Sequence, residues 1–236
     1  MTEALPLFPL GTVLFPGLVL PLHVFEDRYR ELVRHLMALP ADDAREFGVV
    51  AIRHGWEVEH TTPGGEPAGV AMGASPSLYE VGCSALIRQI TEHPDGRFDI
   101  MTVGRRRFRI ARVDETAASY LTAEVEWLPE DDGEEGLADA LAPGVLAAFQ
   151  RYLGMLRGQP MPTGEQLPDD PTVLSHLIAA TASLTIDDRQ YLLALPDTAS
   201  RLKAEHRLLS REVALLDQIR AVPAALSDLA TPSAPN

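Results

Sequence analysis

The residues of this chain that could act as a nucleophile are few, and their surroundings disfavour catalysis. The single cysteine, Cys83, stands in an alternating apolar run, where cysteine is usually a small buried side chain. Ser175 and His176 are adjacent in a predicted helix, so their side chains do not face each other. Lys203 is the only lysine, and it falls on the polar side of another predicted helix, where its amine stays solvated and protonated. These patterns predict a protein that is not an enzyme.

Binding of a metal ion or of a nucleotide is also not predicted. His54 and His60 bracket the segment "HGWEVEH", but in a strand they would be about 20 Å apart, too far for one ion. A phosphate-binding P-loop requires a Gly-Lys pair, whereas Lys203 follows Leu202. We therefore expect no metal site and no cofactor.

Arginines gather in one segment, "RRRFRIARV", at residues 105–113. In a strand, Arg105, Arg107 and Arg109 would share one face, and such a face could bind RNA phosphates or acidic side chains. The formal net charge of −14, however, repels phosphate backbones. We expect instead a solvated strand face whose arginines pair with nearby acids. RNA binding stays as the alternative, and its salt dependence would test it.

The elements that would position these residues begin with a run that has no charged side chain between Glu3 and Glu26. The run is interrupted by Pro6, Pro9, Pro16 and Pro21. Each proline removes an amide donor and clashes with the preceding turn, which excludes a membrane-spanning helix. The run carries Glu3 but no Lys or Arg before its apolar core, unlike a secretory signal. With a single cysteine as well, we predict a cytoplasmic protein without membrane contact.

Periodicity divides the chain into a β-rich half and a helical half. An amphipathic helix is predicted over Phe25–Met37, because apolar residues recur there with a 3.6-residue period. Strands are predicted over 47–54, 78–91, 98–113 and 120–128, with a Gly/Pro-rich loop at 61–77 and a break or bulge at Gly104. Helices are predicted over 137–156, 171–182, 185–195 and 198–220. Asp170 before Pro171 predicts an N-cap for the second of these helices, and Thr185, three residues before Asp188, predicts one for the third.

These elements predict an α+β fold. It consists of a mostly antiparallel β-barrel subdomain with one helix at 1–128, an exposed acidic linker at 129–139, an α-helical bundle subdomain at 140–225 and a disordered tail at 226–236.

Two segments resemble the N-terminal domain family of Lon protease. They are "LPLFPLGTVLFPGLVLPLHVFEDRYRELV" at 5–33 and "LYEVGCSALIRQITEHPDGRFDIMTVGRRRFRI" at 78–110, and an acidic linker and helices then follow as in that family. The resemblance implies a PUA-like β-barrel joined to a helical bundle. In the full-length ATP-dependent proteases this region recognises substrate polypeptides, while separate downstream domains hydrolyse ATP and cut peptide bonds. The chain ends where those domains would begin, so a standalone recognition domain is expected.

The expected function is non-catalytic binding of unfolded or flexible polypeptide segments, as an adaptor or holdase-like factor that works with a protease or chaperone. Such a partner would bind a groove between barrel and bundle, with Phe15, Phe25 and Tyr29 as candidates for lining it. Two alternatives stay open. One is an RNA-binding PUA-like module that uses the arginine strand. The other is a small-molecule enzyme with an unrecognised site between the subdomains, which would need a deep pocket with convergent acids or histidines. The sequence does not indicate the oligomeric state.

Overall fold

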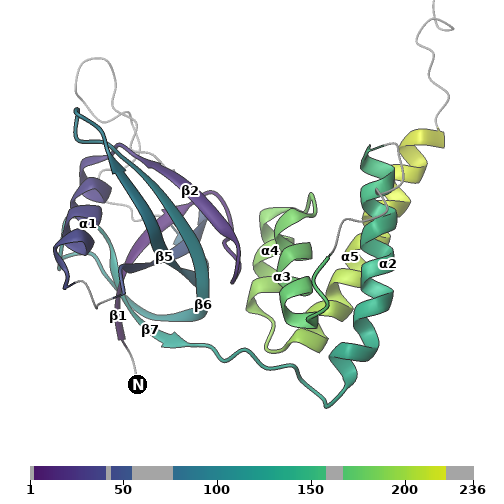
Figure 1. The fold of residues 1–236 in the computed structure, drawn as a ribbon. Helices are drawn as coiled ribbons and strands as arrows, with labels where there is room; N and C mark the ends of the chain where they lie inside the picture. Colours follow the sequence, from purple (N-terminus) through teal and green to yellow (C-terminus); the bar gives the residue numbers. More distant parts are fainter. Residues whose placement is uncertain (1–2, 41–43, 55–76, 158–166, 222–236) are drawn as a thin grey trace, which may run out of the picture.

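The computed structural model describes residues 3–40, 44–54, 77–157 and 167–221, which form two parts. Figure 1 shows the two parts side by side and joined at their base by an extended segment. The β part consists of β1 (Glu3–Leu10), β2 (Val19–Val24), α1 (Asp27–Ala38), β3 (Glu46–His54), β4 (Ser77–Leu78), β5 (Val81–Glu92), β6 (Phe98–Asp114) and β7 (Thr122–Trp127). The helical part consists of α2 (Leu137–Arg157), α3 (Pro171–Thr181), α4 (Ile186–Ala194) and α5 (Thr198–Ala221). The predicted α+β class is confirmed, while the tail at 226–236 and nearly all of the loop at 61–77 lie outside the described residues.

The strands of the β part form a mostly antiparallel sheet that curls round on itself. They pair in the order β1-β7-β6-β5-β3-β4, and β1 also makes a parallel pairing with β3. The central strand is β6, whose first half lies between β2 and β5 and whose second half lies between β7 and β5. Strand β6 continues through Gly104, and its register against β5 shifts between Cys83 and Ala85. The interruption predicted at Gly104 is therefore a bulge and not a break.

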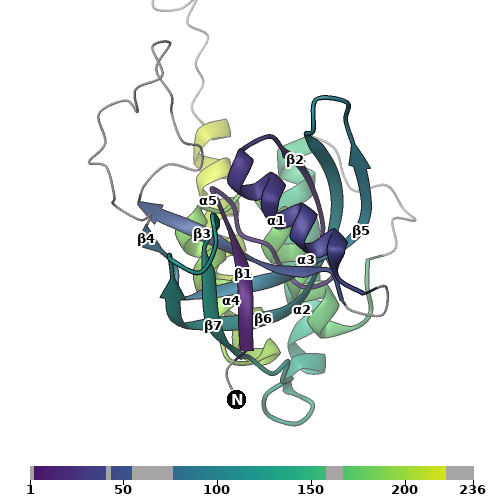
Figure 2. The same cartoon turned by 90° about the vertical axis from the view of Figure 1, so that its left-hand side faces the viewer.

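Helix α1 covers one face of the sheet, as its amphipathic pattern predicts. Its buried side chains are Tyr29, Leu32, Val33 and Leu36. The ring of Tyr29 stacks on Phe8 of β1 with 4.0 Å between the ring centroids. The helix begins at Asp27 with Glu26 as its N-cap, so Phe25 precedes it. Figure 2 shows α1 in front of the strands and the helical part behind them.

The helical part has its own apolar core between α2, α3 and α5, which includes Phe149, Tyr152, Ile178, Leu202 and Leu209. Helix α2 begins at Leu137, so Pro143 lies inside it. The two predicted caps are confirmed. Asp170 accepts a hydrogen bond from the backbone N–H of Val173 at 2.9 Å, and Thr185 accepts one from that of Asp188 at 3.1 Å. None of the helices within the described ranges is long and apolar enough to cross a membrane.

Gly104 is a position where the fold tolerates no side chain. A Cβ atom there would overlap the backbone carbonyl oxygen of Phe15 and lie 3.0 Å from its carbonyl carbon. We expect Gly104→Ala to lower the free energy of unfolding by about 1–3 kcal/mol, because the backbone itself must move. Gly144→Ala in α2 is the control, since nothing lies within 4 Å of its Cβ position. That substitution should raise the free energy of unfolding by up to about 1 kcal/mol. Urea unfolding of both chains measures the difference, and equal stabilities would contradict the expectation.

Candidate functional site

The β part and the helical part meet around the side chain of Arg107 on β6, which is 1% exposed. Its Nε donates to the carboxylate of Glu130 at 2.6 Å. One terminal nitrogen donates to the backbone carbonyls of Leu193 and Leu195 at 2.9 and 2.6 Å, and the other donates to that of Pro129 at 2.9 Å. The guanidinium thus joins β6, the segment after β7 and the end of α4 in one set of hydrogen bonds.

Glu130 extends this contact into the helical part. Its second carboxylate oxygen lies 3.3 Å from Nε2 of His176 on α3 and 3.7 Å from a terminal nitrogen of Arg201 on α5. Arg201 donates through Nε to the hydroxyl of Ser175 at 2.7 Å, and that hydroxyl donates to Glu205 at 2.9 Å. Apart from Glu130, these side chains are almost fully buried. We call this set, with Arg107, the junction network.

Burial and pairing shift the pKa values of the ionisable groups in the junction network in different directions. Burial alone would raise the pKa of Glu130, but hydrogen bonds from His176 and Arg107 and their charges lower that pKa to about 2. Burial raises the pKa of Glu205 well above its ordinary value, and it lowers the pKa of His176. The carboxylate that its neighbours hold in the ionised form is therefore Glu130, which lies beside both guanidinium groups.

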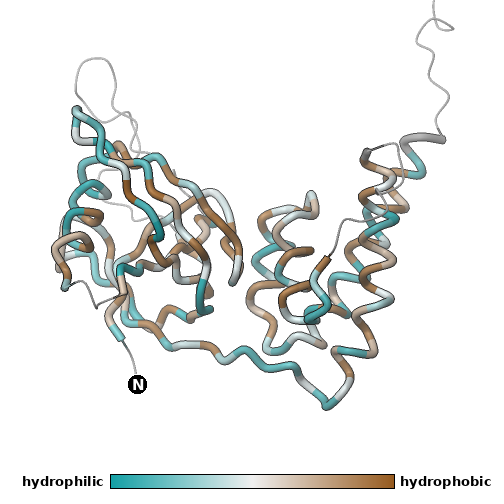
Figure 3. The backbone as a smooth tube through the Cα atoms, in the orientation of Figure 1, coloured by the Kyte–Doolittle hydropathy of each residue, from teal (hydrophilic) through white to brown (hydrophobic). Residues whose placement is uncertain are grey.

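An apolar contact surrounds the junction network. On the β side it includes Val13, Phe15 and Tyr79, and on the helical side Leu192 and Ala204. Phe15 is 0% exposed, and its ring centroid lies 6.0 Å from that of His176. The groove that the sequence placed beside Phe15 is thus filled by packed side chains at this point. The segment predicted as an exposed linker is also anchored here, because Glu130 is held by two buried partners and the carbonyl of Asp131 accepts from Thr198 at 2.8 Å. Figure 3 shows this segment as largely hydrophilic.

The junction network brings acids and a histidine together, as the enzyme alternative requires, but their contacts are those of a structural cluster. The hydroxyl of Ser175 donates to Glu205, while His176 points to Glu130 instead. Both carboxylates are engaged by neighbours within the interface. Ser175, His176 and Glu205 are buried, so a substrate has no access to them.

The three arginines proposed for RNA do not form one surface. Arg105 and Arg109 are exposed, and Arg105 lies 3.3 Å from the carboxylate of Glu46. Arg107 is enclosed in the junction network, so the predicted solvated face is wrong at this residue. The helical part covers the side of β6 from which Arg107 projects, which strand alternation alone does not reveal.

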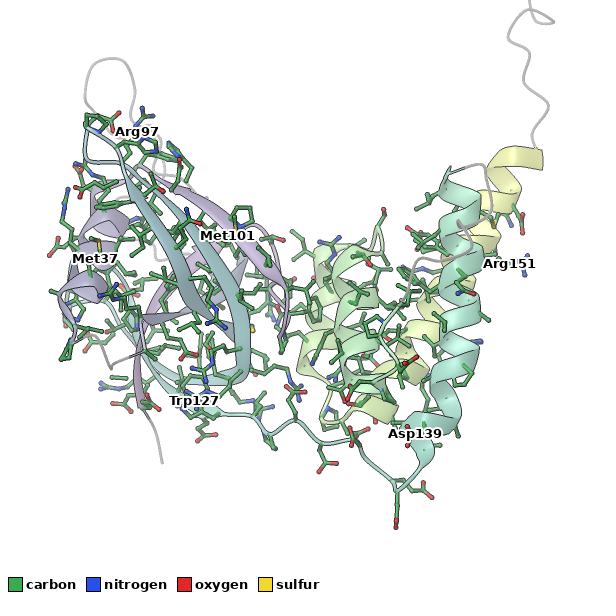
Figure 4. All side chains as sticks on the ribbon, in the orientation of Figure 1. Met37, Arg97, Met101, Trp127, Asp139 and Arg151 are labelled. Atoms are coloured by element: carbon green, nitrogen blue, oxygen red, sulfur yellow. The ribbon has the colours of Figure 1, made fainter. Side chains whose placement is uncertain are left out.

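A second region, on β2, β6 and β5, has no other element packed over it among the described residues. The inner face of these strands, with Leu22, Val24 and Ile100, packs against α1. Their opposite face, which we call the outer face, presents Val19, Pro21 and His23 on β2, Asp99 and Met101 on β6, and Gln89 and Thr91 on β5. Figure 4 shows Met101 on the side of the β part turned toward the helices, and Met37 of α1 on the opposite side.

The outer face carries apolar side chains that contact water. Val19 is 59% exposed and Met101 is 40% exposed. A hollow of about 350 Å³ is lined by residues of all three strands, among them Met101, His23 and Asp99. Phe25, which the sequence proposed for binding, is 47% exposed, and its ring stacks on His23 at this end. Tyr29, the third candidate, is buried in α1 and faces the core.

Comparisons with known proteins agree on one family. Residues 4–211 match the family model described as the ATP-dependent protease La (LON) substrate-binding domain. Lon protease 2 of Herpetosiphon aurantiacus is 33% identical over 223 residues, which cover 92% of this chain and 25% of that protein. Lon protease of Escherichia coli strain K12 is 26% identical over 215 residues, which cover 90% of this chain and 25% of that protein. The chain therefore spans about a quarter of the length of these curated relatives.

Two solved structures share the fold. A Lon N-terminal domain protein from Xanthomonas campestris has a TM-score of 0.51 and 26% identity, covering 88% of this chain and 98% of that one. The N-terminal domain of Mycobacterium avium complex Lon protease has a TM-score of 0.59 and 17% identity, covering 90% of this chain and 98% of that one.

Arg107→Ala tests how much the junction network contributes to the free energy of unfolding. The substitution removes the Arg107 donor from three carbonyls and from one carboxylate oxygen of Glu130, and breaking a buried ion pair in this way typically costs about 3–5 kcal/mol. We expect a loss of that size in the free energy of unfolding, measured in urea. Arg109→Ala is the matched control, because Arg109 is exposed on the same strand and should change stability by no more than about 0.5 kcal/mol. Similar losses in both chains would contradict the assignment.

The stability that Glu130 contributes depends on pH in a predictable direction. Its pKa is about 2 in the folded chain and about 4.3 in an unfolded one, so the contribution is present above about pH 4.5 and is lost as the pH falls toward 2. We expect Glu130→Gln to reduce the free energy of unfolding at pH 6, and the deficit to shrink as the pH approaches 3. Glu124→Gln, which removes an exposed partner of Arg112, should cause little change at either pH. A deficit for Glu130→Gln that stays constant with pH would refute the pairing.

Proposed function

Because this chain belongs to the LON substrate-binding domain family, we propose that it is a non-catalytic module that binds unfolded polypeptide segments on its outer face. Domain membership supports substrate binding in general. The location is our inference from the exposed apolar side chains of that face, above all Val19 and Met101. Exposed apolar side chains gathered on one surface are typical of a protein interaction site.

The shape of the outer face suits an extended segment. Three neighbouring strands span about 10 Å across the sheet, which is wide enough for the side chains of one extended chain to lie between Val19 and Gln89. Within the described residues, β2 pairs only with β6, so its other edge is open. Pro21 lies in the middle of this edge and has no N–H to donate, which hinders the addition of a further strand along β2. Side-chain contacts across the face therefore supply most of the proposed binding.

The charge of the chain favours binding of polypeptide segments that are basic. The chain carries a formal net charge of −14, so segments that combine apolar with basic side chains would be attracted, and acidic segments repelled. At the polar end of the outer face, Asp99 and Gln89 could accept hydrogen bonds from such a segment. We propose that the chain acts in the cytoplasm as an adaptor or holdase, and that a protease or chaperone receives the bound polypeptide.

Binding of a permanently unfolded polypeptide tests this function directly. A small disulfide-bonded protein that has been reduced, alkylated and labelled with a fluorophore serves as the probe, and anisotropy measures the affinity. We expect the double substitution Val19→Ser and Met101→Ser to weaken binding at least about tenfold, because each side chain would lose apolar contact worth about 1 kcal/mol or more. Phe25→Ser should also weaken binding of the probe.

Leu215→Ser provides the control, because Leu215 is similarly exposed at 46% but lies on α5. This chain should bind the probe as the unchanged protein does. Equal affinities of all the chains, or no binding by the unchanged protein, would rule out the outer face as the site.

A further inference from the structure

Three side chains, from β2, from β6 and from the residue after β5, converge at the polar end of the outer face. Nδ1 of His23 lies 2.6 Å from one carboxylate oxygen of Asp99, and Nε2 of His93 lies 2.7 Å from the other. One possible ligand atom from each residue, a ring nitrogen of each histidine and a carboxylate oxygen of Asp99, lies within 4.8 Å of the other two. We propose that His23, His93 and Asp99 form a binding site for a divalent transition metal ion, with Zn²⁺ as the fitting example.

The backbone holds these residues in place. His23 on β2 is the direct cross-strand partner of Asp99 on β6, and Thr91 on β5 is the partner of Asp99 on the other side. His93 follows Thr91 by two residues, at the start of the hairpin turn, where its N–H donates to the carbonyl of Arg97 at 2.8 Å. The contact of His93 with Asp99 places its side chain on the same side of the sheet as that of Asp99. Figure 4 shows Arg97 at the tip of this hairpin.

The donor set selects the class of ion. Two imidazole nitrogens with one carboxylate suit Zn²⁺ and its neighbours, whereas Mg²⁺ and Ca²⁺ prefer sites made of oxygen alone. Around a tetrahedral Zn²⁺ with bonds of about 2.0–2.1 Å, ligand atoms are about 3.3 Å apart. The three side chains are 36–52% exposed, so small rotations can bring their atoms to that spacing. Three protein ligands leave the fourth position to water or to a donor from another molecule.

Proton positions must change when the ion binds. In the present contacts, the N–H groups at His23 Nδ1 and His93 Nε2 point to Asp99, whereas a metal ion requires the lone pairs of these nitrogens. Each neutral ring can move its proton to its other nitrogen, with no net change in charge. At His23 that nitrogen lies 3.5 Å from a terminal nitrogen of Arg97, which is also a donor. The side chain of Arg97 is 49% exposed and paired with Asp95, so it can turn away toward that partner.

Isothermal titration calorimetry of the full chain with Zn²⁺ alone tests the site. We expect one equivalent to bind, and His23→Ala, His93→Ala and Asp99→Asn each to weaken the affinity at least about tenfold, as expected when a ligand is lost. Titration with Co²⁺ should give the visible absorption of a four-coordinate ion, and the same substitutions should abolish it. His23 and Asp99 are exposed and His93 is half-buried, and unchanged urea midpoints of the variants would show that their fold is kept.

Two control variants distinguish this site from nonspecific binding of the ion to other histidines. His35→Ala/His206→Ala removes two exposed histidines elsewhere on the surface, and His54→Ala/His60→Ala removes the pair that the sequence singled out. Both chains should bind Zn²⁺ as the unchanged protein does. The proposal is overturned if no saturable binding of one equivalent occurs, if binding survives in His23→Ala, or if it disappears in either control. The site does not depend on the proposed polypeptide binding, since the titration contains no polypeptide.

Discussion

The buried guanidinium of Arg107 is the interaction on which the relative placement of the two parts depends. A charge this deeply buried is costly unless its donors are satisfied, and here every acceptor comes from outside its own strand. The acceptors belong to the segment after β7 and to the end of α4. If the helical part moved away, it would remove two carbonyls from the guanidinium at once. The junction therefore favours one arrangement, and the surrounding apolar contact between Phe15 and Leu192 adds to it.

This arrangement also decides which surfaces stay open. The helical part packs against the start of β5 and against β6 at Arg107. Gln190 of α4 donates to the carbonyl of Val81 at 2.7 Å. Helix α1 covers the inner face of β2, β6 and β5. Among the residues that the structure describes, none covers the outer face of the same strands, although Val19 and Met101 would gain from burial. Within the described residues, these strands therefore have one face packed under α1 and one face open to solvent.

Local patterns predicted the elements well, because they depend on neighbours along the chain. The amphipathic period over 25–37 gave α1, and the capping residues Asp170 and Thr185 marked the starts of α3 and α4. The role of Arg107 could not be found in this way, because strand alternation grouped it with Arg109 and carries no information about a helical part that docks on β6. The cluster of His23, His93 and Asp99 was also invisible, since His23 is 76 residues from Asp99 and only strand pairing brings them together.

Successive side chains of β2 point to opposite faces of the sheet, so the residues that enter the core determine which residues lie on the outer face. Leu20, Leu22 and Val24 must point toward α1 to be buried, and this fixes which residues point outward. A slip of one residue in the pairing of β2 with β6 would expose all three and would place His23 inside the core. The burial of those apolar side chains therefore holds His23 opposite Asp99, and it does so without any direct contact between the core and the outer face. The geometry of the exposed cluster is thus set by packing on the other side of the sheet.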